Sequence, residues 1–353
     1  MVTFISRQLK IITLQKTLFV LSILLITLIL LIVVGAVAAT AQLRRVKHAL
    51  HVAGFTNNLN ASIVPLPGHA VHASRAATGT GTNAGIYSPD IARCAANLIK
   101  RLTDNVKHHM ARANRTRSTL SATVVDHSNL PEGLMHRKSI YYKKRVIAWV
   151  LVDSKTRPTA IWVVFRGTVS KREWLKNCEV RQVSPSFWDI PEIGVHNGFA
   201  VLYHHIRQQL LIHAVDNLPV YICGYSMGAA LATLFAFELT ATPNRPAVRP
   251  AVYVYIIAGP RIGNSKFTEA LRNAQTNGPL RAFFHIMNLS DVIISIPFTV
   301  TPNLKSPQTP WLYEHAGDML YFTDNWGNWA NNHLLPIYIK NLNHLTKLTK
   351  IEY

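Results

Sequence analysis

The chain has 353 residues, of which 49% are hydrophobic and only 15% are charged. This length provides for one large domain or two small ones, and the composition excludes both a small disulfide-stapled scaffold and a chain that is disordered throughout. Lysine and arginine outnumber aspartate and glutamate by 37 to 17, and the formal net charge of +20 is expected to attract anionic partners such as acidic lipid or nucleic acid. The three cysteines (Cys94, Cys178 and Cys223) have no CxxC spacing, so the sequence predicts neither a zinc site nor a disulfide framework.

An uncharged apolar segment lies near the N-terminus, at residues 17–39. As a helix it would rise about 34 Å, which is enough to cross a bilayer. Small residues at 36–38 and 39–41 also fit the cleavage site of a signal peptide, which would give a secreted form, but the apolar region of a signal peptide spans only about 7–15 residues. The length therefore favours a transmembrane signal-anchor within a first region, residues 1–46, of a single-pass membrane protein. Basic residues flank the segment on both sides, so the side that the rest of the chain faces stays open.

Residues 47–85 are rich in Ala, Gly, Thr, Asn and His, a composition that predicts a flexible tether. No aspartate or glutamate precedes Asp90, so the expected anchor and tether are purely cationic. This charge suits a position close to anionic lipid headgroups. A solvated basic linker without a partner is the alternative.

The remaining residues, 86–353, are expected to form a globular domain. Ser88, Pro89 and Asp90 predict a helix start, because serine caps, proline is tolerated in the first turn and aspartate complements the helix dipole. Short apolar runs predict buried strands at 146–152, 161–165, 219–223, 252–258 and 282–287. Helix-compatible sequence lies between several of these runs, and this alternation predicts an α/β architecture with parallel strands buried on both faces.

The motif Gly-Tyr-Ser-Met-Gly at residues 224–228 follows the strand at 219–223 and precedes a helix-compatible run. A nucleophile in a strand–turn–helix context needs glycine two residues before and two after it, because the neighbouring backbones approach closely. In that geometry Ser226 is a nucleophile above the sheet, and the backbone N–H of Met227 points to the site of a developing oxyanion. A chance match in an ordinary strand-to-helix turn is the alternative.

A serine nucleophile requires a base and an acid that orients the base, which follow it in the order acid, then histidine. Asp291 comes shortly after the apolar run at 282–287, and the C-terminal ends of strands are where α/β sheets gather their site residues. The chain has 16 histidines. By spacing alone, both His315 and His333 qualify as the base.

Five motifs occur in order within residues 91–353: Phe-Arg-Gly-Thr at 165–168, His-Asn-Gly-Phe at 196–199, the serine motif, Gly-Pro-Arg-Ile-Gly-Asn at 259–264, and the segment from Asp291 to Pro297. Together they resemble the class 3 lipase family, which includes secreted fungal triacylglycerol lipases. The resemblance implies an α/β-hydrolase fold with a mostly parallel central sheet. It also implies carboxylic ester hydrolysis through an acyl-enzyme.

The resemblance further implies a catalytic triad. Ser226 matches the family nucleophile, Asp291 the acid and His333 the base. His315 matches instead a Tyr-x-His-x-Gly element that many members carry as structure, which lowers its claim to be the base.

The resemblance places an oxyanion hole and a lid as well. Thr168 takes the position of the first oxyanion donor, and Met227 supplies the second through its backbone. The lid corresponds to residues 171–190, with packing of its aromatic residues into the core as the alternative. The residues expected on its apolar face include Trp174, Phe187 and Trp188.

Two positions depart from the family pattern within the serine motif. Tyr225 and Met227 occur where members commonly have histidine and leucine. Tyr225 is interpreted as a spacer, and Met227 as acting through its backbone. Arg166, in the Phe-Arg-Gly-Thr turn, is interpreted as a buried charge that organises loops rather than as a catalytic group.

The sequence therefore predicts a lipase that cleaves long-chain acylglycerols or phospholipids at a membrane. A catalytically inactive hydrolase-fold membrane protein, acting as an interaction or structural module, is the alternative. No metal or organic cofactor is expected, because no HExxH, EF-hand, Walker or Rossmann pattern occurs in a suitable context. Nucleic acid is not expected as a partner, since the charge is not accompanied by a recognisable binding motif.

Overall fold

The computed structural model describes residues 85–116, 130–153, 159–169, 180–214, 216–243, 250–303, 306 and 308–347. All of them belong to the compact unit Arg75–Tyr353. The predicted anchor at 17–39, the predicted tether apart from Gly85, and Trp174 of the predicted lid lie outside the described residues. Within the described ranges, no helix is both long and apolar enough to span a membrane.

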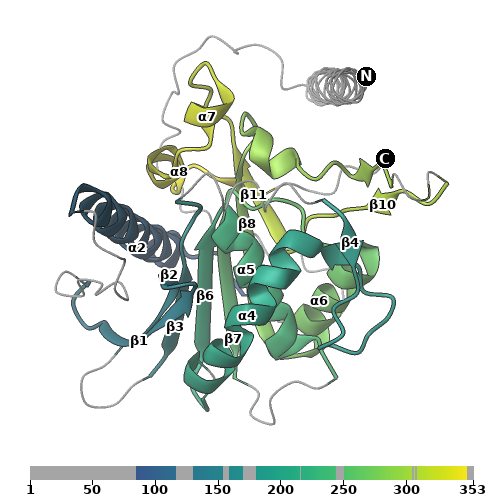
Figure 1. Ribbon diagram of the computed structural model, residues 1–353, viewed down its shortest axis with the longest axis horizontal. Helices are drawn as coiled ribbons and strands as arrows, with labels where there is room; N and C mark the ends of the chain where they lie inside the picture. Colours follow the sequence, from purple (N-terminus) through teal and green to yellow (C-terminus); the bar gives the residue numbers. More distant parts are fainter. Residues whose placement is uncertain are drawn as a thin grey trace, which may run out of the picture. The chain divides into compact units, whose positions relative to one another are not determined.

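A mixed eight-stranded sheet forms the centre of this unit, with the strand order β1-β2-β3-β6-β7-β8-β11-β12 (Figure 1). The strands are β1 (Met135–Tyr142), β2 (Arg145–Val152), β3 (Ile161–Phe165), β6 (Val220–Tyr225), β7 (Val252–Ile257), β8 (Leu280–Asn288), β11 (Asp318–Phe322) and β12 (Thr346–Lys347). The pairings from β3 to β11 are parallel, and those at the two edges are antiparallel. The α/β fold with a mostly parallel sheet is thus confirmed.

Helices cover both faces of the sheet (Figure 1). On one face lie α2 (Pro89–Thr116) and α8 (Leu335–Asn341), and on the other α4 (Asn197–Ala214), α5 (Met227–Thr240) and α6 (Ser265–Asn277). The central strands are continuous apolar runs because neither face meets water. The helix predicted to start at Ser88–Asp90 is confirmed, since α2 begins at Pro89.

Short elements complete the described structure. The strands β4 (Gln182–Val183) and β5 (Val195–His196) form one antiparallel pair, and β9 (Val300–Thr301) and β10 (Trp311–Leu312) form another. The 3₁₀-helix η1 (Val292–Ser295) follows β8, and the four-residue helix α7 (Trp329–Asn332) precedes α8. Both short helices lie next to residues of the candidate site.

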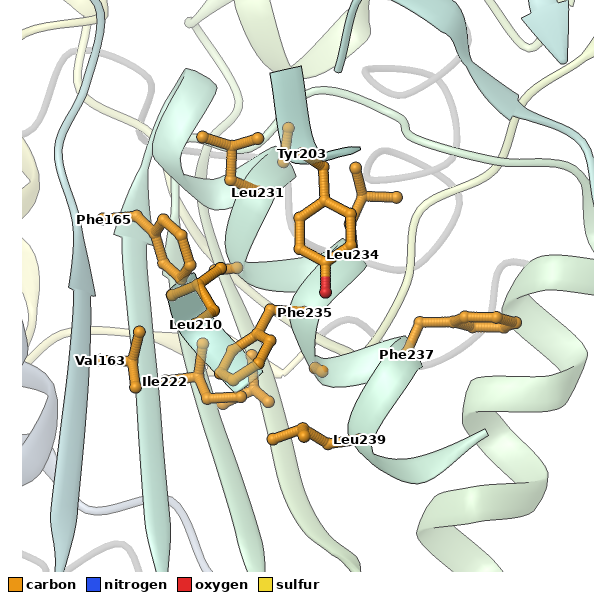
Figure 2. Close-up of a cluster of buried hydrophobic side chains, with 14 of the residues drawn as sticks. Val163, Phe165, Tyr203, Leu210, Ile222, Leu231, Leu234, Phe235, Phe237 and Leu239 are labelled. Carbon is orange, nitrogen blue, oxygen red and sulfur yellow. The ribbon is translucent and has the colours of Figure 1, made fainter. Parts of the chain in front are cut away.

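The helix α5 is buried along its whole length. In Figure 2 its side chains Leu231, Leu234 and Phe235 lie among residues of the strands β3 and β6 and of the helix α4. The one acidic side chain in this helix, Glu238, accepts a hydrogen bond from the hydroxyl of Tyr203 at 2.5 Å and pairs with Arg207, so its charge is not left alone in the core. This packing fixes the position of the first residue of α5, Met227.

Two residues of the predicted lid face are described. Trp188 is only 1% exposed, and its ring centroid lies 4.5 Å from that of Phe237 in α5 and 6.3 Å from that of Phe267 in α6. Phe187 is half-buried, with the guanidinium of Arg207 over its ring at 5.4 Å. Of the two alternatives for Trp188, lid face and core packing, the structure thus shows core packing, because its ring is buried between α5 and α6.

Candidate active site

Ser226 forms the turn between β6 and α5. Its backbone has φ 56° and ψ −122°, a strained conformation for a residue with a side chain. The turn is tied to the next strand because the Ser226 N–H donates to the carbonyl oxygen of Ile257 at 3.0 Å. The side chain is 9% exposed, so its hydroxyl lies at the edge of the core rather than in open solvent.

The two glycines of the motif are required by the close approach of backbones. A Cβ at Gly224 would lie 2.2 Å from the carbonyl oxygen of Gly228. A Cβ at Gly228 would lie 2.4 Å from the carbonyl oxygen of Arg166 and 2.6 Å from that of Phe165. All three distances are far below a van der Waals contact, so only glycine fits at either position. The strand, tight turn and helix expected around Ser226 are present.

Ser226, His333 and Asp291 form a hydrogen-bonded series. The Nε2 atom of His333 lies 2.8 Å from the Oγ of Ser226, and its Nδ1 lies 2.6 Å from the Oδ2 of Asp291. An ionised carboxylate can only accept, so Nδ1 carries the proton and Nε2 is left to accept from the serine hydroxyl. The structure thus brings the three predicted triad residues together, from the segments that follow β6, β8 and β11.

The carboxylate of Asp291 is buried and fully partnered. Besides His333, its Oδ2 accepts from the hydroxyl of Tyr338 at 2.7 Å, and its Oδ1 accepts from the backbone N–H of Ile293 at 2.9 Å. Burial, followed by the nearby Asp291 charge, raises the pKa of Tyr338 well above its usual range, so this hydroxyl remains a proton donor. These donors hold the carboxylate in one orientation and offset the cost of its burial.

Two buried asparagines join the segments that carry Asp291 and His333. The side-chain amide of Asn288 donates to the carbonyl oxygen of Asn332 at 3.2 Å, and its Oδ1 accepts from the N–H of Ser290 at 3.2 Å. The amide of Asn332 donates in turn to the carbonyl oxygen of Ser290 at 2.9 Å. Neither asparagine was predicted from the sequence to have a role. The only feature of the sequence that could have pointed to them is their position in the same short segments as the predicted triad residues.

The two predicted oxyanion donors lie at the same end of the sheet. Thr168 follows β3 and is half-buried, while Met227 is the first residue of α5, and β3 and β6 are adjacent parallel strands. The first N–H groups of a helix lack intrahelical acceptors and lie at the positive end of its dipole, as an oxyanion donor requires. Arg166, just before this loop, is fully buried and donates to the carbonyl oxygens of Val146 at 2.5 Å and Gly167 at 2.7 Å, as expected for a structural charge.

His315 takes no part in the hydrogen-bonded series at Ser226. Its ring lies 5.0 Å from that of His285, a buried residue of β8. Burial lowers the pKa of His285 to about 4 and that of His315 well below its usual value, and the positive charge of Arg261 acts in the same direction on both. Of the two candidate bases, His333 is the one within hydrogen-bond distance of Ser226 and Asp291.

Within the part of the chain that the structure describes, no group of three or more His, Cys, Asp or Glu side chains is arranged to bind a metal ion. The polar groups gathered around Ser226 are a hydroxyl, an imidazole, a carboxylate and backbone amides. These are the groups that acyl transfer by a serine nucleophile uses.

Residues 162–301 match the family model described as "Lipase (class 3)". This match covers less than half of the chain, and over these residues the chain is similar to the class 3 lipase family. The match covers the strands from β3 to β9, and therefore both Ser226 and Asp291.

Curated relatives are similar over less than half of this chain. Phospholipase A(1) DAD1, chloroplastic, from Arabidopsis thaliana is 28% identical over 196 residues, which are 45% of this chain and 42% of that protein. Galactolipase DONGLE, chloroplastic, from the same plant is 30% identical over 191 residues, 44% of this chain and 39% of that protein. Secreted mono- and diacylglycerol lipase A from Penicillium cyclopium is 25% identical over 175 residues, 46% of this chain and 55% of that protein.

Among solved structures, the chain is similar to the native propeptide complex of Rhizomucor miehei lipase. The two are 21% identical with a TM-score of 0.46, and the similarity covers 69% of this chain and 71% of that one.

The matches to the curated relatives span about 40–55% of those proteins' length.

Proposed function

We propose that this protein is a serine carboxylic ester hydrolase, a lipase that cleaves acylglycerols or phospholipids at a membrane through an acyl-enzyme intermediate. The observation that carries the proposal is the hydrogen-bonded series of Ser226, His333 and Asp291, with 2.8 Å and 2.6 Å between the paired atoms. The match of residues 162–301 to the class 3 lipase model supports the same chemistry.

In the first half of the reaction, the Oγ of Ser226 attacks the ester carbonyl carbon while the Nε2 of His333 accepts its proton. Asp291 keeps the imidazole in the required tautomer and stabilises the imidazolium that forms. The N–H groups of Thr168 and Met227 donate to the oxyanion of the tetrahedral intermediate. Loss of one such donor raises a barrier of this kind by about 3 kcal/mol.

The intermediate collapses when the bond between the carbonyl carbon and the alcohol oxygen breaks, and the imidazolium of His333 gives its proton to the leaving alcohol. The acyl group is then joined to Ser226 as an ester. A water molecule attacks this ester as His333 accepts one of its protons. The bond between the carbonyl carbon and the Oγ of Ser226 then breaks as the imidazolium of His333 returns the proton to the Oγ, and the fatty acid leaves the free enzyme.

The relatives and the N-terminal sequence support the proposed substrate class. The relatives are named as a phospholipase A(1), a galactolipase and a mono- and diacylglycerol lipase. The uncharged apolar segment at 17–39 supports a signal-anchor, and the net charge of +20 supports contact with anionic lipid. In this proposal the lipase domain is tethered by residues 47–85 to the bilayer from which it draws its substrate.

The test compares the full chain with its Ser226→Ala variant on phosphatidylcholine vesicles, phosphatidylglycerol vesicles and a diacylglycerol emulsion, with released fatty acid as the readout. The wild type is expected to release fatty acid from at least one of them, and the variant from none. A fluorophosphonate, which reacts with an activated serine, is expected to label the wild type alone. If both proteins are folded and equally inert, the ester hydrolase proposal fails and the inactive membrane module takes its place.

The membrane part of the proposal has a separate test. A variant lacking residues 1–46 is expected to hydrolyse a soluble short-chain ester as fast as the full chain but to act more slowly on vesicles, because it is no longer anchored. Phosphatidylglycerol vesicles are expected to be better substrates than a neutral emulsion. Equal rates for both proteins on every form of substrate would remove the anchor and the charge from the proposal while leaving the chemistry intact.

A further inference from the structure

The aromatic side chain of Tyr225 lies against the candidate base. Tyr225 is the last residue of β6 and directly precedes Ser226. Its ring is stacked on the imidazole of His333, with 5.1 Å between the centroids and 25° between the planes. Its hydroxyl donates a hydrogen bond to the backbone carbonyl oxygen of His333, a residue 108 positions away in the chain.

The same ring contacts the loop that leads to the first oxyanion donor. A Cβ built on Gly167 would lie 2.7 Å from the Cδ1 atom of Tyr225, so the ring is packed directly against the backbone of Gly167. Thr168 is the next residue. One side chain therefore touches the loop of the oxyanion donor and the loop of the base, and is covalently adjacent to the nucleophile.

The hydrogen bonds of His333 leave one motion of its ring unrestrained. Its two ring nitrogens bond to Ser226 and Asp291 within the ring plane, which fixes the line between them but not the tilt of the ring about that line. An aromatic face stacked on the imidazole restrains that tilt. The hydroxyl of Tyr225 also restrains the backbone of His333, which caps the four-residue helix α7 and is not part of a long rigid element.

The hydroxyl of Tyr225 acts as a neutral donor. Burial, together with the nearby charge of Asp291, raises the pKa of Tyr225 well above its usual range. The hydroxyl therefore stays protonated over the whole pH range in which a serine hydrolase works, and its bond to the carbonyl oxygen persists.

We propose that Tyr225 is a positioning residue that sets the tilt of the His333 imidazole and locks the loop of the base to the loop of the oxyanion donor. The inference rests on the proposed function. It replaces the interpretation of Tyr225 as a spacer.

The experiment uses three variants of the full chain. Tyr225→Phe removes the hydroxyl and keeps the stacked ring, and Tyr225→Leu removes both. Tyr221→Leu is the matched control, because Tyr221 is on the same face of β6 and its ring is stacked on Trp162 at 4.7 Å and on Tyr253 at 4.8 Å, outside the triad. The readouts are kcat and KM for a soluble short-chain p-nitrophenyl ester, the rate of fluorophosphonate labelling, and the melting temperature.

A residue that positions the base contributes in the transition state and not to binding, so kcat falls while KM stays unchanged. Tyr225→Phe is expected to lower kcat about 2- to 10-fold, as for the loss of one neutral hydrogen bond. Tyr225→Leu is expected to lower kcat and the labelling rate on the order of 100-fold, as for a displaced catalytic group. Tyr221→Leu is expected to keep kcat within about 2-fold of the wild type, even where it lowers the melting temperature.

The inference is overturned if folded Tyr225→Leu keeps the kcat of the wild type, if KM rises while kcat does not change, or if Tyr221→Leu loses as much kcat as Tyr225→Leu. If Tyr225→Leu does not fold, Tyr225→Phe decides, since unchanged kcat would show that the hydroxyl positions nothing. A wild type that neither hydrolyses esters nor reacts with the fluorophosphonate would instead overturn the proposed function. The two failures are therefore distinguishable.

Discussion

The glycine after the nucleophile, Gly228, faces the backbone of the oxyanion loop. In Gly228→Ala the new Cβ would lie 2.4 Å from the carbonyl oxygen of Arg166, so the loop or the helix must shift. We expect a loss of about 1–3 kcal/mol in the free energy of unfolding, as for an overpacked core, together with the loss of fluorophosphonate labelling. Urea denaturation and labelling measure the two effects.

Gly133→Ala is the control for Gly228→Ala. Gly133 has φ +85°, and a Cβ there meets nothing within 4 Å. It therefore carries only backbone strain of about 1–2 kcal/mol and is expected to keep full labelling. Equal labelling of the two alanine variants would show that the close approach at Gly228 does not shape the site.

In the proposed mechanism, the charge of Asp291 fixes the tautomer of His333. In Asp291→Asn the side chain can donate to Nδ1, which moves the ring proton to Nε2 and leaves no acceptor for the Ser226 hydroxyl. We expect kcat to fall on the order of 10⁴-fold, with KM within a few-fold of the wild type. Steady-state hydrolysis of a soluble ester measures it. A decrease of less than about 10-fold would mean that Asp291 is not the triad acid.

Among single residues, those with a local spacing pattern or a place in a family motif could be predicted from the sequence. The glycine spacing located Ser226, and the order of motifs located Asp291. The choice between His315 and His333 needed either the resemblance or the contact seen in the structure, because both histidines lie at acceptable distances along the chain. The contact of Tyr225 with His333 joins residues 108 positions apart, which no local spacing can show.

Two histidines, His285 on β8 and His315 just before β11, lie in contact with each other. The pKa of His285 is lowered to about 4 in the folded chain, against 6.5 when it is unperturbed, and that of His315 is lowered in the same direction. Between these pH values the unfolded chain binds more protons than the folded chain. The free energy of unfolding should therefore fall as the pH is lowered from about 6.5 to 4, by up to about 1.4 kcal/mol per pH unit for each histidine.

Urea denaturation at pH 7, 6 and 5 measures this dependence. His285→Gln removes one of the two imidazoles and is expected to give a shallower decline than the wild type. His108→Gln, at an exposed position of α2, is the control. A decline equally steep in His285→Gln and the wild type would assign the acid sensitivity to other groups.

Elements with a strong local pattern were predicted, and those that depend on distant partners were not. The strands β2, β3, β6, β7 and β8 and the helix α2 correspond to continuous apolar runs or to one apolar stripe, which sequence alone displays. The strand β11 was missed because its five residues, Asp318–Phe322, are short and half-buried, and it exists by pairing with β8. For Trp188 the sequence left a lid position and a core position open, because an aromatic residue has the same sequence signal in both.

For the whole molecule, α2 forms part of the core although it lies before the family match. Its side chains Leu98, Ile99, Leu102 and Val106 are buried on the sheet face opposite α5. Each contributes about 1.5–3 kcal/mol on burial, and together these contributions are comparable to the whole stability of a domain.

A variant lacking residues 1–116 is therefore expected not to fold. A variant lacking residues 1–84, which keeps α2, is expected to unfold cooperatively and to retain fluorophosphonate labelling. Circular dichroism during thermal unfolding separates them. Cooperative unfolding of the shorter variant would show that α2 is dispensable and that the domain begins later than residue 86.

The strained backbone of Ser226 lowers the stability of the chain, and this cost would no longer be needed if the protein did not have to catalyse a reaction. A residue with a side chain at φ 56° and ψ −122° stores about 1–3 kcal/mol of strain, and glycine adopts this conformation without that strain. Ser226→Gly should therefore be catalytically dead and more stable than both the wild type and Ser226→Ala, which thermal unfolding of the three proteins would show. Selection for thermal stability alone would replace this serine, so the residue marks a position where the fold gives up stability for reactivity.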